Sequence, residues 1–187
     1  MSTNDELFDV LNEDGTKTGR IKSRGEIHRD GDWHGSVHVW VYRKTNGKIL
    51  LLLQKRSKDK DSFPGCYDAG CTGHVDAGEN FVQAAVREVH EELGLETSGE
   101  ELIFLFQKRQ THKAIYSGKP FISNEINSVY VFEREIDGLP IFQKSEIEEV
   151  KWQSADLIIK ELEAENSDYC LQYNETVRVI NYLKNSG

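Results

Sequence analysis

The chain lacks a long apolar run, and this absence excludes a class of proteins. No apolar stretch approaches the roughly 20 residues that a membrane-spanning helix needs. The first ten residues, MSTNDELFDV, contain neither the basic start nor the apolar core of a secretion signal. We therefore expect a cytoplasmic protein that has no membrane partner.

Cysteine is also scarce. The three cysteines, Cys66, Cys71 and Cys170, are an odd number and form no CxxC pair. This pattern is typical of a reducing compartment. A zinc site at Cys66, Cys71 and His74 has irregular spacing and no evident fourth ligand, so we interpret the cysteines as packing residues.

Basic residues are in the minority. Lys and Arg number 23 against 32 Asp and Glu, which gives a net charge of −9. Duplex binding relies on clustered Lys and Arg, so the balance argues against nucleic acid as a general partner. A small phosphorylated substrate stays compatible with this charge, because a bound cation and a few local basic residues can reverse the field at one site. The length of 187 residues fits a single domain over 1–187.

What the chain does contain is an acidic helix. Residues 73–95 read GHVDAGENFVQAAVREVHEELGL. A helix turns by about 100° per residue, so Glu88, Glu91 and Glu92 project from one flank. Three crowded carboxylates repel one another, and hard cations relieve that repulsion because they prefer oxygen ligands. The helix is therefore a candidate platform for Mg²⁺ or Mn²⁺. Its opposite flank carries an apolar stripe made of Val82, Ala85, Val86, Val89 and Leu93.

The order of residues in this segment resembles the Nudix box of the Nudix hydrolase superfamily. The matching positions are Gly73, Glu79, Arg87, Glu88, Val89, Glu91, Glu92, Gly94 and Leu95. A solvated acidic face is the alternative reading, but it does not explain the glycines at both ends. The resemblance implies the Nudix fold, an α/β/α sandwich with a mixed β-sheet, and it covers the chain from about Phe8 onward.

The pattern along the rest of the chain agrees with a mixed sheet that has helices on both sides. An N-terminal β-hairpin forms an extension within residues 1–30, and a second hairpin turns at Asn46-Gly47. A polar loop is predicted over 116–124. The further predicted strands are 36–43, 48–54, 101–109, 127–134 and 147–152, and the further predicted helices are 155–165 and 174–184.

Outside the box, the chain resembles the type I isopentenyl-diphosphate isomerases, a branch of the same superfamily that does not hydrolyse its substrate. The shared positions are Arg56, Lys60, Pro64, Gly65, His74, Asn124 and Glu125. Arg56 and Lys60 follow a buried strand, where they can grip a diphosphate. The alternative is an exposed basic turn balanced by Asp59 and Asp61.

Histidines gather before and within the next strand. His28, His34 and His38 lie within eleven residues of one another, so they are candidates for a metal site or for ordinary packing, and packing is the favoured reading. His34 matches a metal-binding histidine of the isomerases, whereas His28 is one residue out of register with another.

Two departures from the isomerases decide between the activities. Thr72 stands where they carry the cysteine that handles the proton, and Cys71 comes one residue early. Ser123 stands where they carry a metal-binding glutamate. Since the box carboxylates are complete, the sequence predicts a hydrolase.

The predicted reaction is divalent-metal-dependent cleavage of a phosphoanhydride in a nucleoside diphosphate linked to another moiety, or in a similar organic pyrophosphate. The alternatives are an isomerase-like enzyme and a non-catalytic nucleotide-binding sensor. The general base is predicted to be Glu91, with Glu125 second. Arg87 is predicted to fix the glutamate side chains, and Arg56, Lys60 and His74 to bind the substrate. The predicted metal-binding residues are Gly73 through its carbonyl, as the resemblance implies, Glu79 as an outer ligand, Glu88, Glu91 and Glu92.

Substrate selectivity is assigned to the loop 111–123 and to aromatic residues. Trp33, Tyr116 and Phe121 are candidates for stacking on a base, and core or rim packing is the alternative for each. The N-terminal hairpin is a candidate surface for a homodimer.

Overall fold

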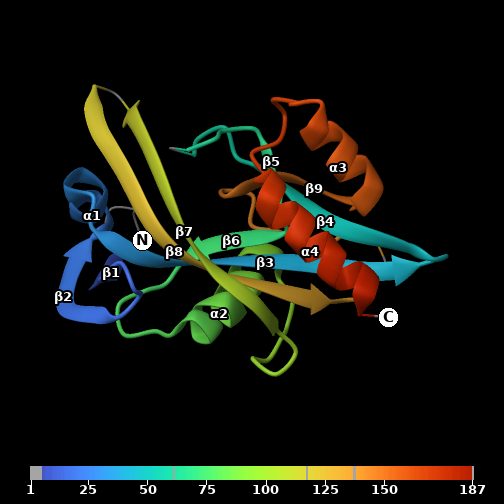
Figure 1. Ribbon diagram of the computed structural model, residues 1–187, viewed down its shortest axis with the longest axis horizontal. Helices are drawn as coiled ribbons and strands as arrows, with labels where there is room; N and C mark the ends of the chain where they lie inside the picture. Colours follow the sequence, from blue (N-terminus) through green and yellow to red (C-terminus); the bar gives the residue numbers. More distant parts are fainter. Residues whose placement is uncertain (1–5, 61, 117, 137, 187) are drawn as a thin grey trace.

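The structure, a computed structural model, describes residues 6–60, 62–116, 118–136 and 138–186. The strands of these segments join in one sheet, and helices cover both of its faces (Figure 1). The elements in chain order are β1 (Leu7–Leu11), β2 (Lys17–Ser23), α1 (Arg24–Asp30), β3 (Trp33–Thr45), β4 (Lys48–Arg56), β5 (Tyr67–Ala69), β6 (Cys71–His74), α2 (Phe81–Leu93), β7 (Ile103–Tyr116), β8 (Lys119–Glu133), β9 (Ile147–Ser154), α3 (Ala155–Glu163) and α4 (Tyr173–Asn185).

Strand β3 is the centre of the sheet. It runs parallel to β8 and antiparallel to β4 and β6, so the sheet is mixed, as predicted. Ser36 lies opposite both His74 of β6 and Asn127 of β8. This register brings three segments that are distant in sequence to one end of the sheet.

The two faces of β3 contribute to two separate cores. Val37, Val39 and Val41 pack beneath α2, whereas Trp40 and Tyr42 pack beneath α3 and α4. Alternate residues of a strand point to opposite faces, so one apolar strand serves both layers. The predicted α/β/α sandwich is confirmed.

Helix α2 forms where the acidic pattern predicted a helix. Asn80 caps its start, with Gln83 completing a capping box, and Gly94 ends it in the left-handed conformation at φ 59°. One position of the predicted apolar stripe is wrong, because Val82 is 38% exposed. Ala84 is fully buried instead and packs in the core between α2 and the sheet.

The N-terminal hairpin ends at Ser23, and the short helix α1 follows it. No helix was predicted at these residues from the sequence. Ser23 and Glu26 form a capping box at its start, which satisfies backbone donors that the short helix leaves free. Phe8, Val10 and Ile27 form a small core that holds the helix against the hairpin.

The predicted loop over 116–124 is wrong. Strands β7 and β8 stay paired through Thr111 and Asn124 as far as Tyr116 and Lys119, with Ser117 outside the described residues. The hairpin reaches past the body of the sheet (Figure 1). Polar residues are tolerated on both faces there, so the strand has no apolar alternation to reveal it.

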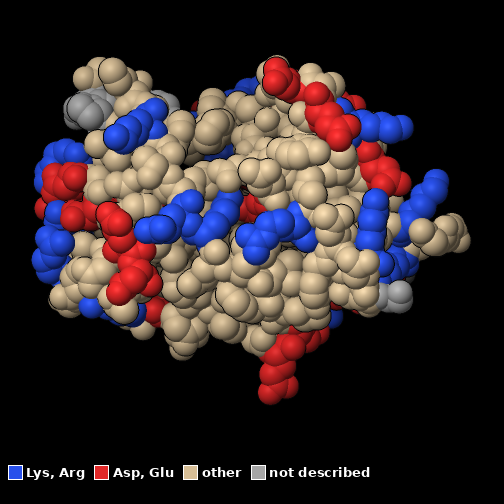
Figure 2. Space-filling view, viewed as in Figure 1, with Lys and Arg blue, Asp and Glu red and all other residues tan. Residues whose placement is uncertain are grey.

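No helix in the described segments is long and apolar enough to cross a membrane. Charges of both signs share the surface shown in Figure 2. Lys and Arg side chains form a broken line across the middle of that face, and acidic side chains lie mainly toward its edges.

Candidate active site

Strand β6 and helix α2 meet at Gly73 and Glu88. A side chain at position 73 would overlap the carboxyl group of Glu88, because an added Cβ falls closer to it than any real Cβ contact. Glycine is therefore required for this close approach. The backbone of β6 therefore lies directly against the carboxylate of Glu88.

Arg87 joins the carboxylates of the box. Its guanidinium donates to Glu79 at 3.0 Å through both Nε and Nη2, to Glu88 Oε1 at 2.8 Å and to Glu91 Oε2 at 3.1 Å. It also donates to the carbonyl of His74 at 2.9 Å. One planar cation with several fixed donors thus orients three acids together with the end of β6.

Burial sets the chemistry of Glu88 and Glu92. Burial and the repulsion between the two carboxylates raise the pKa of Glu88, and burial raises the pKa of Glu92. Glu92 accepts hydrogen bonds from the Thr72 amide and from Gln54, each at 3.3 Å. Neither carboxylate ionises readily beside the other. A divalent cation would offset their negative charge, because it prefers oxygen ligands.

Glu91 and Glu79 occupy the more accessible parts of the box. The Glu91 side chain is 52% exposed, whereas that of Glu88 is 13% exposed. Glu79 precedes the helix instead of starting it, and its carboxylate accepts from the Asp76 amide at 3.2 Å as well as from Arg87. Glu79 therefore helps to hold the loop before α2.

A cavity of about 540 Å³ opens beside these acids. Among the residues that line it are Glu88, Glu91, Glu92, Arg56, Lys60 and Glu125. Burial lowers the pKa of Lys60, which pairs with Glu146. Arg56 donates to Asp68 at 3.2 Å and to the carbonyl of Ser62 at 3.0 Å. Both basic residues therefore border the cavity, and neither pairs with Asp59; Asp61 lies outside the described residues.

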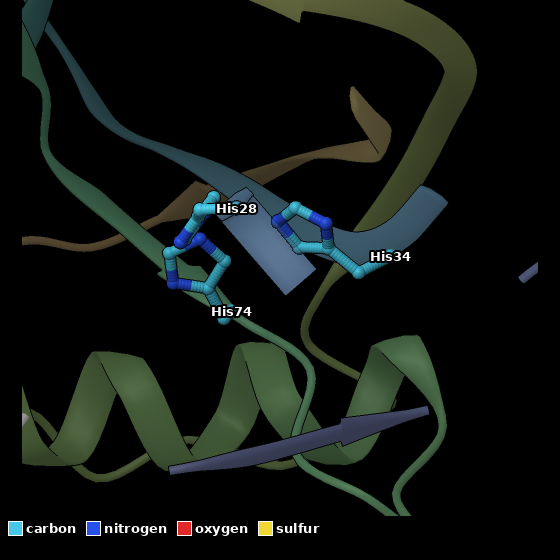
Figure 3. A group of neighbouring side chains, drawn as sticks. All are labelled: His28, His34 and His74. Atoms are coloured by element: carbon cyan, nitrogen blue, oxygen red, sulfur yellow. The ribbon is translucent and has the colours of Figure 1, made fainter. Parts of the chain in front are cut away.

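Three histidines from three elements meet beside the cavity, which His28 and His74 line. His28 of α1, His34 of β3 and His74 of β6 point toward one another (Figure 3), and one ring nitrogen of each lies within 4.8 Å of the others. The ring centroids of His28 and His34 are 5.1 Å apart. His38 is not part of this cluster, because it lies one pair of residues beyond Ser36 on the same face of β3, where it contacts Glu175, and His74 is the third member instead.

The histidine cluster fits a cation. Burial lowers the pKa of His28 to about 3 and lowers the pKa values of His34 and His74, so the rings stay neutral. Nε2 of His28 and Nε2 of His34 are buried and have no hydrogen-bond partner among the described residues. Neutral imidazoles with unpartnered nitrogens are suited to Zn²⁺, Fe²⁺ or Mn²⁺. Because His74 is neutral, it is less suited to bind the negatively charged phosphate of a substrate.

Glu125 stands beside this cluster on β8. Its Oε1 is 4.0 Å from His74 Nε2 and accepts from the Ser123 hydroxyl at 2.5 Å. Its other oxygen accepts from Ser36 at 3.3 Å. Burial opposes ionisation of Glu125, but His34 and the Ser123 hydroxyl outweigh it, and the pKa is lowered. The cavity is thus lined by glutamates from two elements, α2 and β8.

The residues next to Gly73 follow the alternation of an extended strand. Thr72 lines the cavity, and Gln54 donates to its hydroxyl at 3.4 Å. Cys71 is fully buried in the core beneath α2, where burial raises the pKa of its thiol well above the ordinary value. The cavity-facing position therefore carries a hydroxyl group instead of a thiol. Cys66 is not part of the three-histidine cluster, the candidate metal-binding group among the described residues.

Sequence reasoning missed a second polar cluster on the cavity wall. His38 contacts Glu175 of α4 at 2.9 Å, and Asn127 links His38 to Ser36. One signal was available in the sequence. Glu175 occupies the same helical face as the apolar residues Val179 and Leu183, so its spacing marked it as buried.

The aromatic candidates separate into different roles. Phe121 lines the cavity and stacks on His28 with ring centroids 4.4 Å apart. Trp33 is half-buried at the start of β3 and is not one of the residues that line the cavity. The side chain of Tyr116 lies outside the described residues. Phe63 and His112 add an aromatic contact at the cavity rim, with centroids 4.9 Å apart.

Known proteins share both the sequence pattern and the fold. Nudix hydrolase 3 of Arabidopsis thaliana is 42% identical over 154 residues, which cover 79% of this chain and 19% of that protein. The chain thus spans only about a fifth of that relative. An isopentenyl-diphosphate Delta-isomerase of Pectobacterium atrosepticum is 27% identical over 82% of this chain and 79% of its own length.

One solved structure and one family model also match this chain. The crystal structure of a C. elegans Ap4A hydrolase binary complex has a TM-score of 0.55 and 26% identity, and the match covers 80% of this chain and 96% of that one. The NUDIX domain model matches residues 32–172, which include the acidic helix and the cavity wall formed by β3 and β8. The chain belongs to the Nudix hydrolase family.

Proposed function

We propose that this protein is a pyrophosphohydrolase that cleaves a phosphoanhydride bond in a nucleoside diphosphate linked to another moiety, or in a similar organic pyrophosphate. The observation that carries the proposal is the set of box glutamates gathered by Arg87 beside the 540 Å³ cavity. Basic residues border the same cavity, so one space offers both acidic metal ligands and partners for phosphate.

The residues present fit Mg²⁺ or Mn²⁺. Glu88, Glu91 and Glu92 would hold the cation together with the carbonyl of Gly73, and Glu79 would act as an outer ligand. Two observations support this assignment, namely the close approach at Gly73 and the raised pKa values of the buried glutamates. When bound, such a cation neutralises phosphate charge and makes water more nucleophilic.

The chain itself supplies orientation and proton transfer. Arg87 fixes the rotamers of the box glutamates, and Arg56 and Lys60 hold the diphosphate. We assign the general base to Glu91, because its exposed carboxylate can reach a water in the cavity. Glu125 is the second candidate, since it also lines the cavity and its lowered pKa keeps it ionised.

Isomerisation of an allylic diphosphate is the second candidate function. The histidine cluster and the isomerase relative favour it. The position of Thr72 opposes it, because the thiol of the neighbouring Cys71 is sealed in the core. Release of phosphate without migration of a double bond would separate the two reactions.

A substrate screen tests the proposal. Nucleotides, nucleotide sugars, dinucleoside polyphosphates and isopentenyl diphosphate would be incubated with Mg²⁺ or Mn²⁺, and the products would be identified. We expect phosphoanhydride cleavage of at least one compound. The absence of any turnover by a metal-loaded protein would overturn the proposed activity.

Variants test the assignment of the base. Glu91→Gln should lower kcat by at least about 100-fold, the scale of general base catalysis. Glu125→Gln is the matched comparison on β8. Near full activity of Glu91→Gln together with an inactive Glu125→Gln would transfer the role to Glu125.

A further inference from the structure

Glu175 is a buried acid on helix α4, which lies beyond the segment 32–172 that matches the family model. Its side chain is 3% exposed. The carboxylate faces His38 Nδ1 at 2.9 Å and accepts from Trp40 Nε1 at 2.9 Å, and it also pairs with the ammonium of Lys108. Burial opposes ionisation, but His38 and Lys108 hold the pKa of Glu175 at about 2. A permanent negative charge is therefore fixed beneath the C-terminal helix.

A row of buried polar groups leads from this charge to Glu125. His38 Nε2 lies 3.2 Å from Asn127 Nδ2, and Asn127 Oδ1 accepts from the Ser36 hydroxyl at 3.1 Å. Ser36 also lies 3.3 Å from Glu125 Oε2. Asn127 is fully buried and Ser36 is 4% exposed, so water has little access to the middle of this row. Alternate residues of β3 and β8 thus form a continuous path across the sheet.

Donor and acceptor rules restrict this path to two arrangements. A carboxylate only accepts, so His38 Nδ1 donates to Glu175. If His38 is neutral, its Nε2 accepts from the Asn127 amide, and the Asn127 oxygen takes the single proton of Ser36. If His38 is protonated, the amide must turn, because two donors cannot face each other. The turned amide donates to the Ser36 oxygen, and the hydroxyl proton then points to Glu125.

The carboxylate of Glu175 stabilises the protonated form of His38, which the second arrangement requires. Burial and the nearby Lys108 lower the pKa of His38, but Glu175 outweighs them with help from Asp68, and the pKa is raised. Gln110 faces the Asn127 amide at 2.9 Å, and its own amide can turn in concert with it. The charge of Glu175 therefore selects the partner of the Ser36 proton.

We propose that Glu175 is a positioning residue of the active site, which acts through His38, Asn127 and Ser36 to direct the Ser36 hydroxyl onto Glu125. Ser36, His38, Glu125 and Glu175 all line the same cavity. The inference rests on the proposed function, in which Glu125 lines the substrate cavity and is the second candidate for the general base. It adds a part of the active site that residues 32–172 do not contain.

Kinetics of four variants test the coupling. Glu175→Gln keeps the shape of the side chain but removes its charge. We therefore expect kcat to fall about tenfold with little change in KM, which is the size of effect typical of a residue that orients another residue of the site. Ser36→Ala should have a similar effect, and the double variant should be no worse than either single one. Val179→Ala, a buried change on the same helix, should lower the melting temperature and leave kcat unchanged. Multiplicative losses in the double variant, or an unchanged kcat for Glu175→Gln, would overturn the proposal.

A measurement without turnover keeps this inference separate from the proposed function. The side-chain amide of Asn127 can be followed by ¹⁵N NMR, with Asn127→Asp to assign its signals. We expect these signals to shift in Glu175→Gln and to stay in place in Val179→Ala. If the protein hydrolyses nothing, the proposed function fails, and the amide signals still decide the coupling. Unchanged Asn127 signals in Glu175→Gln would refute it.

Discussion

Gly73 and Glu88 offer the sharpest test at the scale of single residues. We expect Gly73→Ala to lower kcat/KM by at least about 100-fold, because the new methyl group must push the Glu88 carboxylate away from the site. Gly25→Ala is the matched control, since a Cβ there meets nothing within 4 Å and the backbone is helical. Steady-state kinetics and Mn²⁺ titration of both variants measure the effect. Equal activities of the two variants would show that the close approach is not needed.

The sequence was sufficient to find residues whose spacing lies within one element. Glu88, Glu91 and Glu92 follow from the pitch of a helix, and their arrangement around Arg87 needs no distant partner. The pairing of distant strands decides which histidines meet, and no local pattern encodes it. His74 joins His34 because β6 pairs with β3, whereas His38 lies farther along the same face of β3 and contacts Glu175 of α4.

At the scale of elements, the N-terminal cap of α2 supports the first turn of the acidic helix. Asn80→Ala removes the side-chain acceptor for the Gln83 amide, so we expect the free energy of unfolding to fall by about 1 kcal/mol. Asn80→Asp retains an acceptor and serves as the control, with a loss below about 0.5 kcal/mol. Urea denaturation measures both. Equal losses in the two variants would mean that the cap does not act through this hydrogen bond.

Elements were predictable where apolar periodicity or turn residues define them. Helix α2, helix α4 and the hairpin at Asn46-Gly47 all have such signals, and the structure contains each of them. The outer half of the β7–β8 hairpin lacks them, because its strands extend past the core and tolerate polar residues on both faces. Helix α1 has seven residues, too few to show a helical period.

At the scale of the whole molecule, the active site collects two kinds of residues that respond to pH in opposite ways. Glu88 and Glu92 have raised pKa values, so the folded protein binds more protons than the unfolded chain at neutral pH, and acidification stabilises it. His28, His34 and His74 have lowered pKa values. When the pH falls below 6.5, the ordinary pKa of histidine, these three side chains take up protons more readily in the unfolded chain than in the folded protein. Acidification therefore destabilises the fold through them.

These opposing slopes predict that the metal-free protein is most stable near the pH at which they cross, close to about 6.5. Stability should decrease from there to about pH 8 as Glu88 and Glu92 are forced to ionise together. Glu88→Gln removes this repulsion, so the unfolding free energy of this variant should change less between about pH 6.5 and 8.

Mn²⁺ should stabilise the wild type near pH 8, where the carboxylates are free to bind it. At about 100 times its dissociation constant, it should add about 2.7 kcal/mol to the unfolding free energy. Urea denaturation across the pH range, with and without Mn²⁺, measures all three effects. Parallel curves for metal-free wild type and Glu88→Gln between about pH 6.5 and 8 would contradict the assignment of this slope to the paired glutamates.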